Sequence, residues 1–157
     1  MPDLTHLHPM VVHFPIALLI IGFLSDVAGL IFKKSFFTQA GFYLLILGAL
    51  GVTAAWFSGQ NAGAGISEEG LLKQALETHE GAARLTIWLV MAAAIARVVV
   101  VLFKKYTGML KAGVLLLYFL GVVAIARTGY YGGELVYKHA AGVQFDLGFG
   151  LDAVTNE

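Results

Sequence analysis

Histidines are the residues of this chain with the clearest chemical potential, and they flank hydrophobic segments rather than lying inside them. The chain has 5 histidines and 0 cysteines. Without cysteine, thiolate metal sites, iron–sulfur clusters, thioether-linked haem and disulfides are excluded, which leaves imidazoles and carboxylates as ligands. Neutral imidazole binds haem iron, Zn²⁺ and Cu²⁺. The candidate cofactor or metal ligands are His8, His13, His79 and His139.

The spacing of His8 and His13 limits how they can act together. Pro9 and Pro15 favour non-helical backbone before each of them, so the first helix is expected to begin at Pro15. Even in a continuous helix the two side chains would point about 140° apart. We therefore do not expect them to bind one iron from one face. Two haems sharing four histidines, and one haem with two histidines in other roles, are both open.

Other residues near the same segment ends fit a haem site. Arg84 and Arg127 could bind haem propionates. Gly132 and Gly133 would let backbone approach a macrocycle closely. Enzymatic signatures such as a Ser/His/Asp set or a phosphate loop do not occur, so an electron-transfer module is favoured over a stand-alone enzyme.

The elements that must position these residues are membrane spans. Of the residues, 59% are hydrophobic and 13% charged, and the mean hydropathy is +0.81, far more apolar than a soluble domain. Each of four segments has near the ~20 apolar residues that cross a bilayer: 15–32, 38–57, 82–103 and 111–131. We predict an all-α integral membrane four-helix bundle, a single domain over 1–157. The long loop 58–81 includes an amphipathic stretch, 68–77, expected to lie on the membrane surface, and a tail follows at 132–157.

Lysines give the expected orientation. Five of the 7 lysines lie in or next to the two short loops: Lys33, Lys34, Lys104, Lys105 and Lys111. By the positive-inside rule, both termini and the long loop face the periplasm from a bacterial inner membrane, and all 5 histidines are on that outer side. No Lys or Arg precedes the first apolar run, which predicts a retained span rather than a signal peptide.

Three sequence blocks resemble a known family. HPMVVHFPIALL at 8–19, THEGAARLT at 78–86 and GGELVYKHAAGV at 132–143 are similar to the DUF2231 family of predicted bacterial membrane proteins, and the resemblance covers essentially the whole chain. It implies a four-span inner-membrane protein whose motif histidines correspond to His8, His13, His79 and His139. Many relatives have an acidic residue after a glycine near the outer end of the second span. Here the segment reads Ser58, Gly59, Gln60 and Asn61, which argues against a proton-handling role at that position.

Three functions are consistent with these features. The first, which we favour, is a redox module that holds one or two b-type haems near the outer face and passes electrons between a quinol or membrane enzyme and a periplasmic carrier. The second is a Zn²⁺- or Cu²⁺-binding membrane protein for sensing or delivery. The third is a structural subunit whose histidines cap helices and hold the tail. Membrane lipid is the expected surrounding, a homo-oligomer or a larger complex is open, and the zero net charge gives no sign of nucleic-acid binding.

Two specific contacts are predicted. Asp26 and Arg97 lie at matching depths in two spans that we take as neighbours, and burying an unpaired charge there is costly, so they should form an ion pair inside the bundle. In a haem site, His79 should be an axial ligand, with His13 or His139 as its expected partner, whereas His6 is expected to be an interfacial hydrogen-bonding residue.

Overall fold

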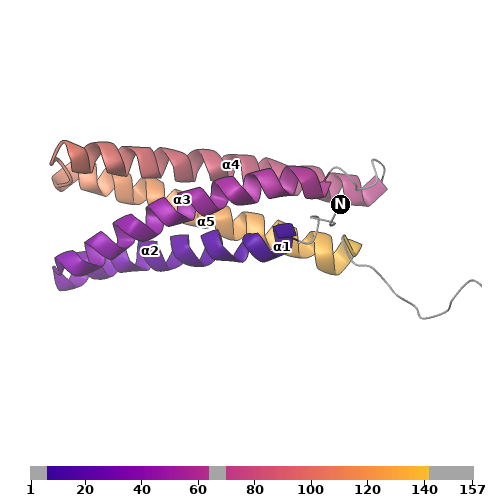
Figure 1. The fold of residues 1–157 in the computed structure, drawn as a ribbon, viewed down its shortest axis with the longest axis horizontal. Helices are drawn as coiled ribbons and strands as arrows, with labels where there is room; N and C mark the ends of the chain where they lie inside the picture. The colour runs from indigo at the N-terminus through magenta and orange to yellow at the C-terminus, as the bar shows by residue number, and fades with distance from the viewer. Residues whose placement is uncertain (1–6, 64–69, 142–157) are drawn as a thin grey trace, which may run out of the picture.

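The described chain is entirely helical. The computed structural model describes residues 7–63 and 70–141. The helices are α1 (Leu7–Val11), α2 (His13–Phe32), α3 (Ser35–Gly63), α4 (Gly70–Leu102) and α5 (Gly108–His139) (Figure 1). Four helices, with α1 and α2 counted as one, are long and apolar enough to cross a membrane. The prediction of a four-span helical bundle is confirmed at this level.

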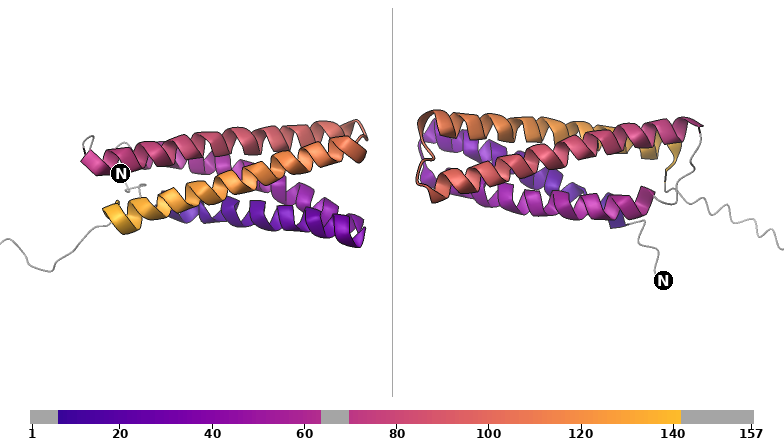
Figure 2. Two further views of the ribbon diagram at one scale, coloured as in Figure 1. Left: turned by 180° about the vertical axis from the view of Figure 1, so that it is seen from behind. Right: turned by 90° about the horizontal axis from the view of Figure 1, so that it is seen from above.

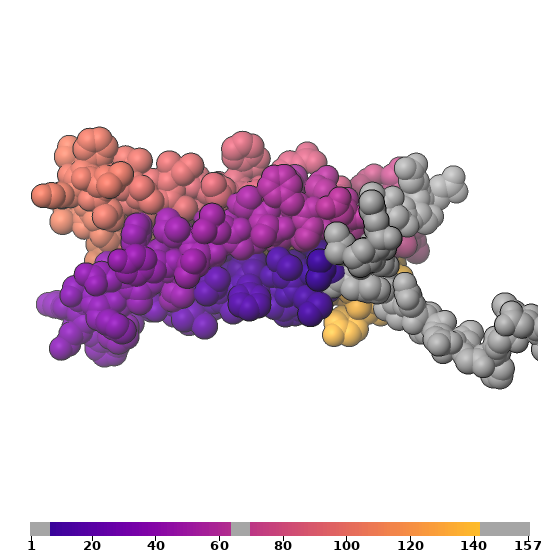
Figure 3. Space-filling view, in the orientation of Figure 1, coloured from indigo at the N-terminus to yellow at the C-terminus, as the bar shows by residue number. Residues whose placement is uncertain are grey.

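Two hairpins make up the bundle. Helices α2 and α3 pack closely along their length, as do α4 and α5, while α3 against α4 and α2 against α5 form less extensive contacts. Within residues 7–63 and 70–141, the α2 and α4 backbones do not approach each other closely, so these two helices are diagonal in the bundle. Views from behind and from above show the hairpins running side by side (Figure 2), and the molecule is elongated along the helices (Figure 3).

The two ends of the bundle differ in composition. The short connections 33–34 and 103–107 lie together at one end, with the five lysines in or next to them. We call this the lysine end. Helix α1, the last turns of α3, the first turns of α4 and the last turns of α5 lie at the other end, which carries His8, His79 and His139 (Figure 1). We call it the histidine end.

The first helix starts earlier than predicted. Pro9 is in the first turn of α1 and Pro15 in the first turn of α2, so the expectation of non-helical backbone before each proline was wrong. The N–H groups of a first turn have no partner inside the helix, and proline is tolerated there. Only Val12 interrupts the two helices, and its N–H donates to the His8 carbonyl at 3.1 Å.

The predicted loop 58–81 is largely helical. Helix α3 continues to Gly63 and α4 begins at Gly70, so residues 70–77 continue the span helix rather than lying on the membrane surface. Leu71 and Ala75 from this stretch line a cavity together with Tyr131 of α5, and Leu71 is largely exposed. Residues 68–69 lie outside the described residues. At 1.5 Å per residue α4 is ~50 Å long, well beyond a hydrocarbon core of ~30 Å.

The predicted tail 132–157 also begins as helix. Residues 132–139 are the last turns of α5, and 142–157 lie outside the described residues. Helices α4 and α5 therefore both extend beyond the predicted apolar spans at the histidine end. The prediction for His6 also lies outside the described residues.

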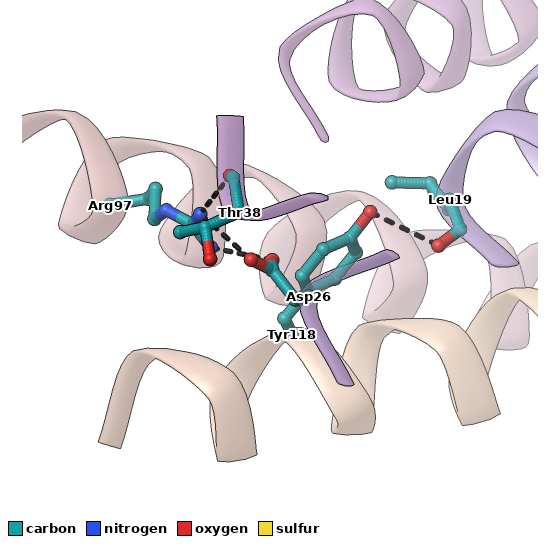
Figure 4. A network of polar contacts seen from close by, with 5 residues as sticks. All are labelled: Leu19, Asp26, Thr38, Arg97 and Tyr118. Carbon is teal, nitrogen blue, oxygen red and sulfur yellow. Dashed lines mark hydrogen bonds and ion pairs between the residues drawn. The ribbon is translucent and has the colours of Figure 1, made fainter. Parts of the chain in front are cut away.

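A buried ion pair joins the diagonal helices. Arg97 Nη1 donates to Asp26 Oδ2 at 2.6 Å and Nη2 to Oδ1 at 2.9 Å, and both residues are 1% exposed (Figure 4). Nη2 also donates to the Thr38 carbonyl at 2.9 Å. A Cβ at Gly41 would lie 2.6 Å from Asp26 Cγ, so the glycine makes room for the carboxylate. The predicted pair is confirmed, although the two helices are diagonal rather than neighbouring.

Candidate histidine site

His8 and His79 meet at the histidine end. His8 comes from α1 and His79 from α4, and their ring centroids are 6.4 Å apart with the planes at 79°. Helix α3 supplies a partner for the first ring and α5 a partner for the second. Since α1 leads into α2, which is diagonal to α4, the two imidazoles approach each other across the bundle.

Both rings are held through the same nitrogen. Ser58 Oγ donates to the Ala55 carbonyl at 3.0 Å, so it accepts from the Nδ1–H of His8 at 2.9 Å. His79 Nδ1–H donates to the Thr128 carbonyl at 3.2 Å. A neutral imidazole has one N–H, so in each ring the proton is on Nδ1 and the lone pair is on Nε2. This is the tautomer in which Nε2 can bind a metal.

A threonine pair supports the His79 acceptor. Thr128 Oγ1 donates to the Ala124 carbonyl at 3.0 Å and accepts from Thr86 Oγ1 at 2.8 Å. The Thr128 hydroxyl is therefore engaged within the bundle, and its carbonyl accepts from His79. These bonds join α4 to α5 and fix the position of the carbonyl that orients His79.

Glycines let both rings approach helix backbones. A Cβ at Gly59 would lie 2.9 Å from His8 Cε1, and one at Gly132 would lie 3.3 Å from His79 Cε1. The predicted approach of Gly132 to a macrocycle stays a prediction, and in the structure the His79 imidazole lies next to this glycine. Any larger residue at Gly59 would push the His8 ring from its position.

Both imidazoles favour the neutral state. Both residues precede the apolar spans. Burial lowers the pKa of His8, and the nearby charge of His79 lowers it further, whereas the hydrogen bond to the Ala55 carbonyl raises it. Burial also lowers the pKa of His79. The Thr128 carbonyl and the Glu80 carboxylate raise this pKa, but by less than burial lowers it. Neutral pH therefore leaves both Nε2 lone pairs available.

The other two histidines lie elsewhere. His13 is exposed, and its Nδ1–H donates to the Pro9 carbonyl at 2.6 Å. His139 lines a separate cavity of 240 Å³ between α4 and α5, together with Thr78 and Glu134. Of the sequence-predicted ligands, the structure brings together only His8 and His79. Among residues 7–63 and 70–141, no three His, Asp or Glu side chains gather as a metal-ion site.

The predicted propionate ligands are both exposed. Arg127 Nε donates to Tyr131 Oη at 3.2 Å, and its guanidinium lies 5.2 Å from the Tyr131 ring centroid. Arg84 is exposed on α4 beyond His79. Neither arginine contacts the facing imidazoles through a hydrogen bond in the described part of the chain, and their proposed role with propionates stays a prediction.

Comparison with known proteins gives the family. A family model described as "Predicted membrane protein (DUF2231)" matches residues 5–145. The chain belongs to the DUF2231 family. The match includes all five helices and all four candidate histidines. Neither the curated proteins nor the solved structures give a match. Because the family description states a membrane setting and no activity, the function of this DUF2231 protein has to be argued from its site.

Sequence reasoning missed the residues that hold the rings. Ser58 was noted only as a departure from relatives. Thr128 binds His79 through its backbone carbonyl, which every residue has, so the sequence could not indicate this contact. Thr86 could have been found, because it lies two helical turns after His79 and so shares its face of α4. A polar residue on the histidine face of an apolar span is the signal that was available.

Proposed function

We propose that this DUF2231 protein is a membrane-embedded electron-transfer module that binds a b-type haem between His8 and His79. The observation that supports it most strongly is the pairing of two imidazoles whose Nδ1 protons are both engaged by the protein. Hydrogen bonding of Nδ1–H to a carbonyl or hydroxyl orients a ligating histidine and raises its basicity. The two Nε2 atoms are then the groups left to bind an iron.

The distance between the two rings supports the proposal. Two imidazoles on one metal, each with a metal–nitrogen distance of about 2.0 Å, have centroids roughly 6 Å apart. The observed centroid distance is 6.4 Å. Facing helices of bundles are the usual source of such inward ligands. When bound, the haem would supply one-electron chemistry, while His8 and His79 would hold it at this end of the bundle.

The number of ligands favours haem over a metal ion. Two imidazoles such as His8 and His79 would be enough to hold a b-type haem, whereas zinc takes three or four protein ligands. His13 and His139, which would extend the set, are directed to Pro9 and to a separate cavity. A Zn²⁺ or Cu²⁺ site at His8 and His79 is the second candidate, supported by the same free Nε2 atoms.

The proposed setting follows from charge. The lysine end would face the cytoplasm, so the histidine end and both termini would face the periplasm of a bacterial inner membrane. Electrons would then pass from a quinol or a membrane enzyme to a periplasmic carrier through the histidine end. The protein could work alone, as a homo-oligomer or in a larger redox complex, which co-purification would distinguish.

The test is the optical spectrum of the purified protein and its variants. Wild type expressed with adequate haem supply should show a Soret band and a reducible α-band. His79→Ala and His8→Ala should each lose the haem or convert it from low-spin, because an axial imidazole is removed. His13→Ala is the matched control and should keep the wild-type spectrum.

Three outcomes would contradict the proposal. An unchanged spectrum and haem stoichiometry in His79→Ala would reject the ligand assignment. Loss of haem in His13→Ala but not in His8→Ala would reject the pairing. A colourless wild type that holds stoichiometric zinc or copper would support the metal-ion function instead.

A further inference from the structure

The lysine end is strongly positive. Four of its lysines are exposed and Lys111 is half-buried: Lys33, Lys34, Lys104, Lys105 and Lys111. The acidic side chain in this half of the described bundle is Asp26, which is buried and paired with Arg97. The surface charge of this end is therefore uncompensated by nearby acidic groups of residues 7–63 and 70–141.

Apolar side chains place these lysines at the level of lipid headgroups. Large exposed hydrophobic residues end the helices just before the lysines or follow them at once: Phe32, Phe36, Leu102 and Phe103. Since the helices are long and apolar enough to cross a membrane, we expect these side chains to contact acyl chains. The lysines next to them then lie at the headgroups, whichever side of the membrane this end faces.

Two of the lysines occupy backbone positions that favour glycine. Lys33 has φ 53° and Lys104 has φ 55°, both in the left-handed region that follows a helix. The turn at Lys104 is closed by N–H groups of Lys104 and Lys105 that donate to the Val101 and Val100 carbonyls at 2.9 and 2.8 Å. Glycine is the preferred residue at such a position because it has no Cβ. At both helix ends, therefore, a charge is present where backbone stability favours glycine.

Aromatic contacts hold the second connection in place. The Tyr106 ring lies over Arg97, with the guanidinium carbon 4.1 Å from the ring centroid, and Lys111 Nζ is 5.6 Å from the same centroid. The α4–α5 connection is thus folded onto the buried ion pair, and Lys111 is held beside it. The lysines of this connection are presented by an ordered turn.

We propose that the lysine end is a binding surface for anionic phospholipid headgroups, with Lys33 and Lys104 retained at left-handed helix ends for their charge. The partner is a lipid rather than a free phosphate, because the exposed phenylalanines beside the lysines fit acyl chains. The proposal is independent of haem binding at the opposite end.

The test uses the double variant Lys33→Gly/Lys104→Gly and two measurements that should move in opposite directions. In neutral detergent, glycine relieves the left-handed backbone, so the thermal midpoint should rise by a few degrees. Retention of phosphatidylglycerol in native mass spectrometry should fall, with affinity lower by about 25-fold, because each lysine near an anionic surface contributes about fivefold. Phosphatidylcholine retention should not change.

The matched control removes the same charge from the other end. Lys73→Gln/Lys138→Gln should bind phosphatidylglycerol as wild type does. Equal loss in this control, or an unchanged phosphatidylglycerol affinity in the glycine variant, would overturn the proposal. A lower thermal midpoint of the glycine variant in neutral detergent would overturn the claim that Lys33 and Lys104 are retained for their charge at a cost in backbone stability. Displacement of the lipid by millimolar inorganic phosphate would show a phosphate site instead.

Discussion

Replacing Arg97 by methionine should destabilise the bundle by about 3–5 kcal/mol, the range for breaking a buried pair by removing one partner. Arg97 and Asp26 are each 1% exposed, so water cannot solvate the carboxylate that is left behind. The Thr38 carbonyl also loses its donor, which adds to the effect.

The control variants separate charge from packing. The double variant Asp26→Leu/Arg97→Met removes both charges and should lie within about 1.5 kcal/mol of wild type, since a buried pair is often replaced by apolar residues with little loss. Arg84→Met removes an exposed arginine from the same helix and should change stability by less than about 0.5 kcal/mol.

Equilibrium unfolding in mixed micelles, followed by far-UV circular dichroism, measures these differences. The reasoning would be refuted if Arg97→Met stayed within about 1 kcal/mol of wild type, or if the double variant were as unstable as the single one. The second result would mean that the side chains matter for their shape and not for their charges.

Three further predictions concern the histidine end. Gly59→Ala should lower the haem-to-protein ratio more than Gly132→Ala, because its Cβ would lie 2.9 Å rather than 3.3 Å from an imidazole carbon; the reverse order would contradict the site geometry. The pKa of both His8 and His79 is lowered on folding, so the unfolded chain binds more protons just below pH 6.5. The thermal midpoint of the haem-free protein should therefore fall as the pH drops below about 6.5 and level off above it, and His8→Gln/His79→Gln should flatten this dependence. A reporter fused after the C-terminus should be active only if it functions in the periplasm; cytoplasmic activity would reverse the proposed orientation.

The sequence was sufficient for the spans and the ion pair because both follow from the low polarity of lipid. Apolar length defines a span, and a charge such as Asp26 inside it requires a partner at the same depth, which Arg97 supplies. Their diagonal relation could not be predicted, because it depends on how the two hairpins pack.

The histidine pairing was only partly predictable. The spacing of His8 and His13 predicted that they do not bind one iron from one face, and in the structure the two rings have different partners, Ser58 and the Pro9 carbonyl. The sequence favoured His13 or His139 beside His79, whereas the structure has His8 there. Pro9 was expected to favour non-helical backbone, yet in a first turn it permits a helix, and from α1 the His8 ring reaches Ser58 and His79. The helical extension of α4 was missed because its polar residues looked like a loop.

The diagonal ion pair has a consequence for how the chain enters the membrane. Asp26 is in α2 and Arg97 in α4, so the carboxylate is synthesised well before its partner. Until α4 arrives, the α2–α3 hairpin has to hold the unpaired Asp26 carboxylate away from the acyl chains, for example at the insertion machinery. A nascent chain truncated before Arg97 should therefore be poorly integrated and readily degraded, whereas one truncated just after α4 should not. The first hairpin becomes committed to the bilayer only when the second one is made.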